Sequence, residues 1–294
     1  MPKRPDIEAL RLLSVLGIVW FHSAASGIAL AYSGLIAFLV LSMALGGRSG
    51  QPDAATVRRR AVRLLRPWLA WFGIYAAFNL ARGLPALPTE NGWLAGVLAG
   101  PSIHLWYLPF VFFALLTLDL LRAHVALRTL AATAWLLALA LMAAAPLWRP
   151  VTLSLYYPNL QWADAVAPAL AGVFALGAAQ WPRRVALALA AALVLAAAVL
   201  AAYEWVGMPY AVGLAASLLV LLRTPGAAPA GPLNLAPLTD CAFGIYRSHS
   251  LVYALLLGVP DLPAAWLPLA IFVVALGATW ALRRGLPRVA AYLT

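Results

Sequence analysis

Arg11 and His22 are two ionisable residues in an otherwise apolar stretch near the start of the chain. If the stretch is an α-helix, their spacing leaves the two side chains only about 20° apart around the axis and roughly 16 Å apart along it. A histidine can take a proton from a hydroxyl near neutral pH, and an arginine can bind phosphate. The pair could therefore line a polar channel. Alternatively, Arg11 reaches lipid phosphate and His22 bonds to a neighbouring helix.

Other ionisable residues interrupt the apolar stretches further along the chain. Inside a bilayer each would cost roughly 2.5–3.5 kcal/mol unless it is paired or hydrated, so each needs a partner or a function. They are His104, Asp119, Glu204, Arg247 and His249, with Asp164 and Asp240 at the edges of such stretches. The spacings HExxH and CxxC do not occur, so no metal site is predicted.

The composition of the chain defines the environment of these residues. Of its 294 residues, 65% are hydrophobic and 10% are charged, whereas a typical soluble domain has roughly 25% charged residues. These values exclude an ordinary soluble enzyme and a disordered chain, and they indicate a membrane protein with several spans. The net charge of +11 indicates cytoplasmic loops beside anionic lipid, and no nucleic-acid partner is expected.

Ten mostly apolar stretches approach the roughly 20 residues that a helix needs to cross a bilayer. They cover residues 9–30, 32–46, 64–82, 102–121, 129–148, 163–181, 185–204, 207–222, 241–258 and 264–282. The second and the eighth are short and could instead be re-entrant or kinked segments. The expected fold is therefore an all-α integral membrane protein with about ten transmembrane helices.

The basic residues are distributed as this topology requires. With the N-terminus in the cytoplasm and ten alternating spans, sixteen of the twenty Lys and Arg residues fall on the cytoplasmic side, two on the opposite side and two within spans. This is the positive-inside distribution of membrane proteins, and it puts both termini in the cytoplasm. Every connection is shorter than twenty residues, so the whole chain, 1–294, is expected to form one transmembrane domain without a soluble domain.

Four short stretches carry distinct patterns in order along the chain. Residues 11–22 hold an Arg, ten residues and a His; 59–68 hold a basic RxxR pattern; 104–109 read HLWYLP; 244–249 read GIYRSH. Together these stretches resemble the motifs of the acyltransferase 3 family of integral membrane acyltransferases, in which the last pattern is a late Tyr-x-x-His helix. The family's Trp-Ser-Leu-x-x-Glu-like motif on a middle span has no counterpart in this chain.

The resemblance implies a membrane-bound enzyme that moves an acyl group, expected to be acetyl, from cytoplasmic acyl-CoA to a sugar hydroxyl of an envelope or exported glycan. Acyl-CoA would be the donor substrate, and no permanently bound cofactor is expected. The implied location is the bacterial inner membrane. The expected partners are acyl-CoA, a glycan or lipid-linked sugar acceptor and membrane lipids.

The resemblance also assigns roles to the residues of the first two stretches. His22 would be the base that deprotonates the acceptor hydroxyl, or a transient acyl carrier, and Arg11 would act with it at the donor end. Arg60, Arg63 and Arg66 would bind donor phosphates, because a guanidinium group donates paired hydrogen bonds to phosphate oxygens. The residues alone also allow this cluster to be an ordinary anchor to lipid headgroups.

The two later stretches supply supporting residues. His249 could face His22 across a central cavity, and His104 with Trp106 could hold a sugar; Tyr246 would support the site. Helix–helix hydrogen bonds and an interfacial aromatic belt are the alternative explanations. Two other functions also remain open: a transporter or flippase for a glycan or lipid-linked sugar, and a partner subunit that passes the acyl group to a soluble transferase.

Overall fold

The computed structural model describes the chain except for residues 1–3, 48–52, 91, 156, 224–234 and 260–261. All secondary structure in the described part is helical, so the predicted all-α class is confirmed. The helices are α1 (Pro5–His22), α2 (Ile28–Ala31), α3 (Ser33–Gly46), α4 (Ala54–Ala81), α5 (Trp93–Ala99), α6 (Tyr107–Arg122), α7 (Leu127–Ala143), α8 (Ala145–Ser154), α9 (Asn159–Gly177), η1 (Ala178–Gln180), α10 (Arg183–Leu200), α11 (Gly207–Leu221), α12 (Ala236–Thr239), α13 (Ala242–Leu256), α14 (Leu267–Gly285) and α15 (Pro287–Leu293).

Each of the ten predicted spans overlaps one of the longer helices. By length and apolar composition, however, only four segments of the described chain qualify as membrane spans, or five if a bent pair is counted as one span. The four are Ile28–Gly46, Asn159–Gln180, Arg183–Leu200 and Leu267–Gly285, and the bent pair is Leu127–Ala143 with Ala145–Ser154. Several apolar helices of this kind are typical of a multi-pass membrane protein.

Four of the five remaining predicted spans fall short for two physical reasons. The helices α6, α11 and α13 have 16, 15 and 15 residues, and α1 carries Asp6, Glu8 and Arg11. The count of ten spans and the cytoplasmic position of both termini therefore stay predictions. Lys3 and Arg48, which were counted on the cytoplasmic side, lie outside the described residues.

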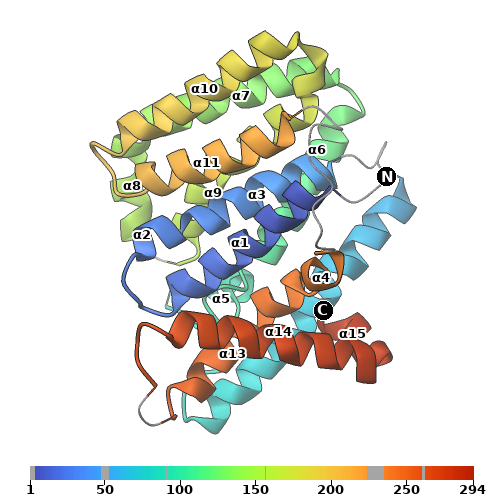
Figure 1. Cartoon of the computed structure of the whole chain (residues 1–294), viewed down its shortest axis with the longest axis vertical. Coiled ribbons are helices and arrows are strands. Elements are labelled where there is room, and N and C mark those ends of the chain that lie inside the picture. The colour runs from blue at the N-terminus through green and yellow to red at the C-terminus, as the bar shows by residue number, and fades with distance from the viewer. Residues whose placement is uncertain (1–3, 48–52, 91, 156, 224–234, 260–261) are drawn as a thin grey trace.

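The long helices lie side by side in a layered bundle (Figure 1). Helix α3 packs between α1 and α9, α9 also packs on α7, and α10 and α11 cover the upper side of the view. Helix α13 pairs with α14, and α4 packs on α6 and α15. Because α1 contacts α3, α11, α13 and α14, one of its sides packs into the bundle, and Ser14 and Ile18 on its predicted stripe are buried.

Glycine allows the backbones of α1 and α3 to approach closely. A Cβ atom on Gly17 would lie 2.7 Å from the carbonyl oxygen of Ala31, and one on Gly34 would overlap the carbonyl oxygen of Ser14. Small residues at such crossings let membrane helices pack against each other without a gap. This contact holds the stripe that contains Arg11 and His22 against α3.

We expect Gly34→Leu to destabilise the bundle, because a side chain there must push α1 away from α3. Overpacking of this kind lowers the free energy of unfolding by about 1–3 kcal/mol. Thermal unfolding of the purified protein in detergent measures the effect. Gly277→Leu is the control, since a Cβ atom at Gly277 meets no other atom within 4 Å. Equal unfolding midpoints for the two variants would contradict the close-contact explanation.

Candidate functional site

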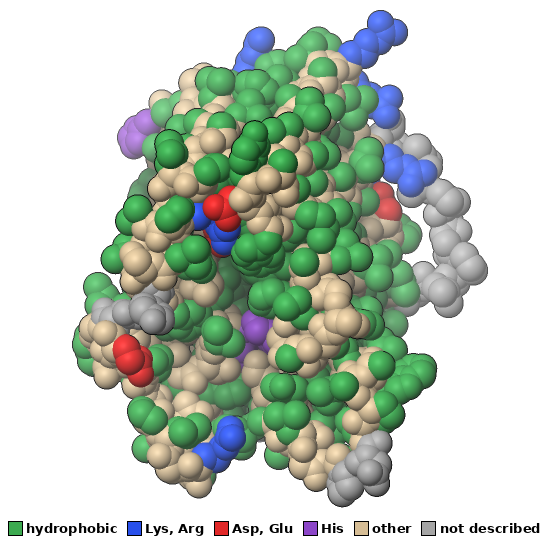
Figure 2. Space-filling view, turned by 90° about the vertical axis from the view of Figure 1, so that its left-hand side faces the viewer, with side chains coloured by type: hydrophobic (Ala, Val, Ile, Leu, Met, Phe, Trp, Pro, Cys, Tyr) green, Lys and Arg blue, Asp and Glu red, His purple; other side chains and the backbone are tan. Residues whose placement is uncertain are grey.

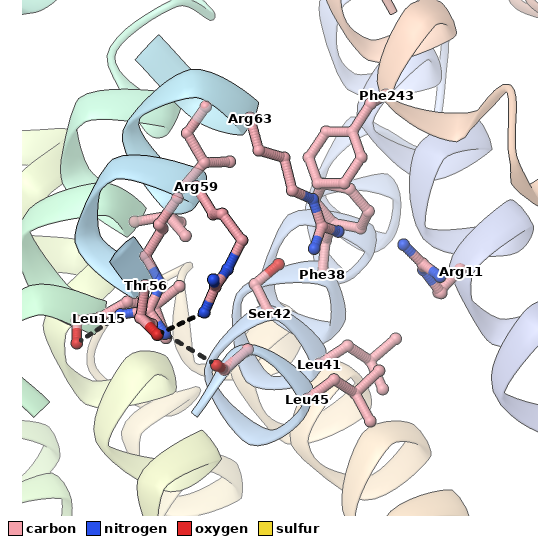
Figure 3. A pocket seen from close by; sticks show the side chains of 14 residues that line it. Arg11, Phe38, Leu41, Ser42, Leu45, Thr56, Arg59, Arg63, Leu115 and Phe243 are labelled. Atoms are coloured by element: carbon pink, nitrogen blue, oxygen red, sulfur yellow. Dashed lines mark hydrogen bonds between the residues drawn. The ribbon is translucent and has the colours of Figure 1, made fainter. Parts of the chain in front are cut away.

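A cavity of about 470 Å³ lies between α1, α3, α4 and α6, and we call it the arginine cavity. Four arginines line it: Arg11, Arg59, Arg60 and Arg63. Figure 3 shows that Arg11 from α1 and Arg63 from α4 extend toward the same space, with Phe38 and Phe243 beside Arg63. Charged groups from two distant segments of the chain thus meet at one end of the α1 stripe.

Arg60 is the one cation of this cavity that the fold uses as a structural link. Its guanidinium forms an ion pair with Asp119, which is fully buried, and donates 3.1 Å hydrogen bonds to the carbonyl oxygens of Leu115 and Gly46. These contacts tie α4 to α6 and to the end of α3. The charge of Arg60 is therefore compensated inside the protein, although its side chain forms part of the cavity wall.

Arg11, Arg59 and Arg63 provide the positive charge that remains. Arg59 donates to the hydroxyl of Thr56 at 2.7 Å, and the Arg63 guanidinium lies 5.9 Å from the centre of the Phe243 ring. In the described part of the chain, no carboxylate forms an ion pair with any of the three. A cavity with several guanidinium groups that are not in ion pairs is suited to an anion such as a phosphate.

Arg66 lies outside the arginine cavity. Its guanidinium lies over the ring of Tyr292, 4.3 Å from the ring centre, and donates to the carbonyl oxygen of Ala291. The side chain therefore holds α15 against α4. Arg66 was predicted to bind donor phosphates together with Arg60 and Arg63, but its guanidinium packs on the C-terminal helix α15 and not in the cavity that they line.

A second cavity, of about 190 Å³, lies at the other end of the α1 stripe, and we call it the histidine cavity. His22, His104, Trp106, Gln161 and Asp164 are among the residues that line it. Figure 2 shows histidine within a hollow on the face that lies at the left of Figure 1. The two cavities share no lining residue.

Three aromatic rings separate the two cavities. Phe38 lines the arginine cavity, Tyr246 lines the histidine cavity, and the Tyr107 ring lies 5.4 Å from the first and 5.2 Å from the second. All three are buried. The Tyr107 hydroxyl is 2.6 Å from the hydroxyl of Ser42, and the Tyr246 hydroxyl donates to the carbonyl oxygen of His104. We call these three rings the aromatic layer.

The three histidines of the predicted site form one cluster beside the histidine cavity. His22 from α1 and His249 from α13 approach within 3.3 Å, between Nδ1 of His22 and Nε2 of His249. His104 precedes α6, and its ring centre is 4.6 Å from that of His249. The hydroxyl of Ser250 lies 2.9 Å from Nδ1 of His104 and 3.3 Å from Nε2 of His249.

Backbone carbonyls fix the position of the proton on each ring. A carbonyl oxygen only accepts hydrogen bonds, so the ring nitrogen next to it carries the hydrogen in a neutral imidazole. Nδ1 of His22 is 2.9 Å from the Ile18 carbonyl oxygen, and Nδ1 of His249 is 2.6 Å from that of Tyr246. For His104 the nitrogen beside a carbonyl is Nε2, 3.1 Å from the oxygen of Arg247.

This pattern leaves Nε2 of His22 as a proton acceptor. The Nδ1–H group of His22 donates to Ile18 and faces Nε2 of His249, which has no hydrogen of its own in this tautomer. Nε2 of His22 has no hydrogen-bond partner among the described residues, and the side chain lines the cavity. The arrangement is that of a base whose second nitrogen is oriented by neighbouring acceptors.

Sequence reasoning missed a buried charge cluster next to this cavity. Arg149 donates to both oxygens of Asp164, at 3.0 and 3.3 Å, and also to Glu204. Arg149 and Asp164 are buried, and the sequence alone indicated no partner for either. The available signal was that all three charges lie close to the ends of predicted spans, where facing residues of neighbouring helices can meet.

Comparison with known sequences assigns the family. The sequence model of the acyltransferase 3 family, described as an acyltransferase domain, matches residues 4–284. Curated proteins and solved structures give no significant match. The matched region includes both cavities, the aromatic layer and the histidine cluster. The chain therefore belongs to the acyltransferase 3 family and is a membrane acyltransferase.

Proposed function

We propose that the protein transfers an acyl group, in the first instance acetyl, from cytoplasmic acyl-CoA to a sugar hydroxyl of an envelope or exported glycan in the bacterial inner membrane. One observation supports the proposal. One end of the α1 stripe lies at a cavity with arginines that form no ion pair with a described carboxylate, and the other end has a histidine ring nitrogen without a described hydrogen-bond partner. The arginine end faces the cytoplasm in the topology that the basic residues predict.

The arginine cavity has the chemistry that the donor needs. Coenzyme A carries phosphate groups, and Arg11, Arg59 and Arg63 offer guanidinium groups that are not paired with described carboxylates. The volume of about 470 Å³ falls within the range of about 300–1,000 Å³ that is common for small-molecule sites. We assign Arg60 to shaping this cavity, because Asp119 neutralises it.

His22 supplies the acid–base chemistry at the other end. For transfer, the side chains of the aromatic layer move aside and the thioester reaches His22. Its Nε2 then takes the proton of the acceptor hydroxyl, the hydroxyl oxygen bonds to the thioester carbon, and the carbon–sulfur bond breaks. The proton then passes from His22 to the departing thiolate, which leaves as free CoA. While His22 is protonated, its Nδ1–H group donates to the Ile18 carbonyl and to Nε2 of His249. A route through an acyl-histidine would use the same nitrogen.

His22→Gln is expected to lower acyl-CoA turnover by about 10²–10⁴-fold, the usual contribution of a general base. Release of CoA by detergent-purified protein, with a glycan extract as acceptor, measures the rate. His124→Gln is the control, because His124 is exposed and lies outside both cavities. The proposed role fails if His22→Gln unfolds at the wild-type temperature and still turns over at the wild-type rate.

Arg63→Gln is expected to raise KM for acyl-CoA roughly tenfold, because a hydrogen bond to a charged group contributes about 1.5–3 kcal/mol. The apparent affinity for the glycan acceptor should change little. Arg58→Gln is the matched control, since Arg58 is an exposed arginine of the same helix that does not line the cavity. An unchanged KM in Arg63→Gln, or an equal rise in both variants, would argue against a donor site in the arginine cavity.

A further inference from the structure

We propose that the histidine cavity binds a neutral sugar ring, that Gln161 binds one of its hydroxyls, and that the excess carboxylate beside Asp164 rejects acidic sugars. The inference rests on the proposed function, because the bound ring would present the hydroxyl that His22 deprotonates. It goes further by naming the class of acceptor and the residues that select it.

The size and the walls of the cavity fit a single ring. Its volume of about 190 Å³ is below the range of about 300–1,000 Å³ that is common for drug-sized ligands. Trp106, Trp205 and Tyr32 line it. The carbon-bound hydrogens of a sugar ring make an apolar face, which packs on aromatic rings, while its hydroxyls point sideways to polar groups. Trp106 is buried, so it faces this cavity and does not belong to a lipid-facing belt.

Gln161 brings an unsatisfied polar atom to this cavity. Its Oε1 is buried and has no hydrogen-bond partner among the described residues. A buried acceptor without a partner costs free energy, which a ligand hydroxyl would recover by donating to it. Gln161 lies three residues before Asp164 on α9, so both side chains are on one face of the helix.

The charges beside the cavity do not balance. One guanidinium, that of Arg149, serves two carboxylates, those of Asp164 and Glu204. One negative charge is therefore in excess, and Asp164 itself lines the cavity. His22 and His104, which also line it, are neutral in the tautomers that their carbonyl partners require. No Lys or Arg is among the described lining residues, and the Arg149 guanidinium beside the cavity is already shared by two carboxylates, so a ligand carboxylate would meet net repulsion.

Protection of His22 from diethyl pyrocarbonate, a reagent for unprotonated imidazole nitrogens, tests this assignment without using enzyme activity. The purified full chain in detergent is treated alone, with methyl glucoside, or with methyl glucuronide, which differs by a carboxylate in place of a hydroxymethyl group. Mass spectrometry follows modification of His22, with exposed His124 as the internal reference. We expect the glucoside to slow modification of His22 several-fold and the glucuronide to leave it unchanged.

Two pairs of variants assign the effect to particular side chains. In Gln161→Ala, the glucoside should protect His22 from modification several-fold less than in the wild type. In Gln180→Ala, which changes an exposed glutamine outside the cavity, protection should be unchanged. Glu204→Gln removes the excess charge and should allow the glucuronide to protect, whereas Glu90→Gln, an exposed carboxylate outside the cavity, should not.

Three results would overturn the inference. If neither sugar protects His22, the cavity is not a sugar site. If both sugars protect it equally, the cavity does not select against a carboxylate. If Gln161→Ala and Glu204→Gln behave as the wild type, the two assigned residues do not have the proposed roles. Turnover of acyl-CoA, measured separately, tests the proposed function. Selective protection without turnover would support the sugar site and contradict acyl transfer through His22. Turnover without protection would support acyl transfer and contradict the sugar site.

Discussion

A charge inside an apolar bundle must be paired, and this constraint organises the molecule. Arg60 with Asp119 and Arg149 with Asp164 and Glu204 satisfy it at two levels of the bundle, where they join helices that are distant in sequence. Among the described residues, Arg11 and Arg63, which have no ion pair, line a cavity at one end of α1, and His22 lines a cavity at the other. Buried Arg247 lies outside both cavities, where it donates to the carbonyl oxygen of Leu293 and packs on Phe243. The structural ion pairs thus hold the walls around the two cavities in which we propose that substrates bind.

The sequence predicted the position of the helices well, because apolar runs of sufficient length have few alternatives. It was less able to predict how many of them cross the membrane. Helix α1 carries Asp6, Glu8 and Arg11, and α13, which is also short, carries Arg247 and His249, so both are less apolar than the more exposed α10 and α14. The feature that suits these helices to a site also weakens their signal as spans.

In the candidate site, spacing along the chain determines geometry only between residues of one helix. Arg11 and His22 lie at two ends of one stripe because eleven residues return to nearly the same face. The approach of His249 to His22, the displacement of Arg66 toward Tyr292 and the pairing of Arg149 depend on how separate helices pack. No local pattern contains that information, and a single sequence does not provide it.

The aromatic layer has a consequence for the cell as well as for the reaction. Phe38, Tyr107 and Tyr246 are buried and lie between the two cavities, which have no lining residue in common, so the two ends of the α1 stripe belong to separate chambers. A membrane that stores energy as a proton gradient cannot contain an open aqueous tunnel. Apolar rings between two polar cavities hinder the passage of protons and ions from one cavity to the other, whichever way the protein faces in its bilayer.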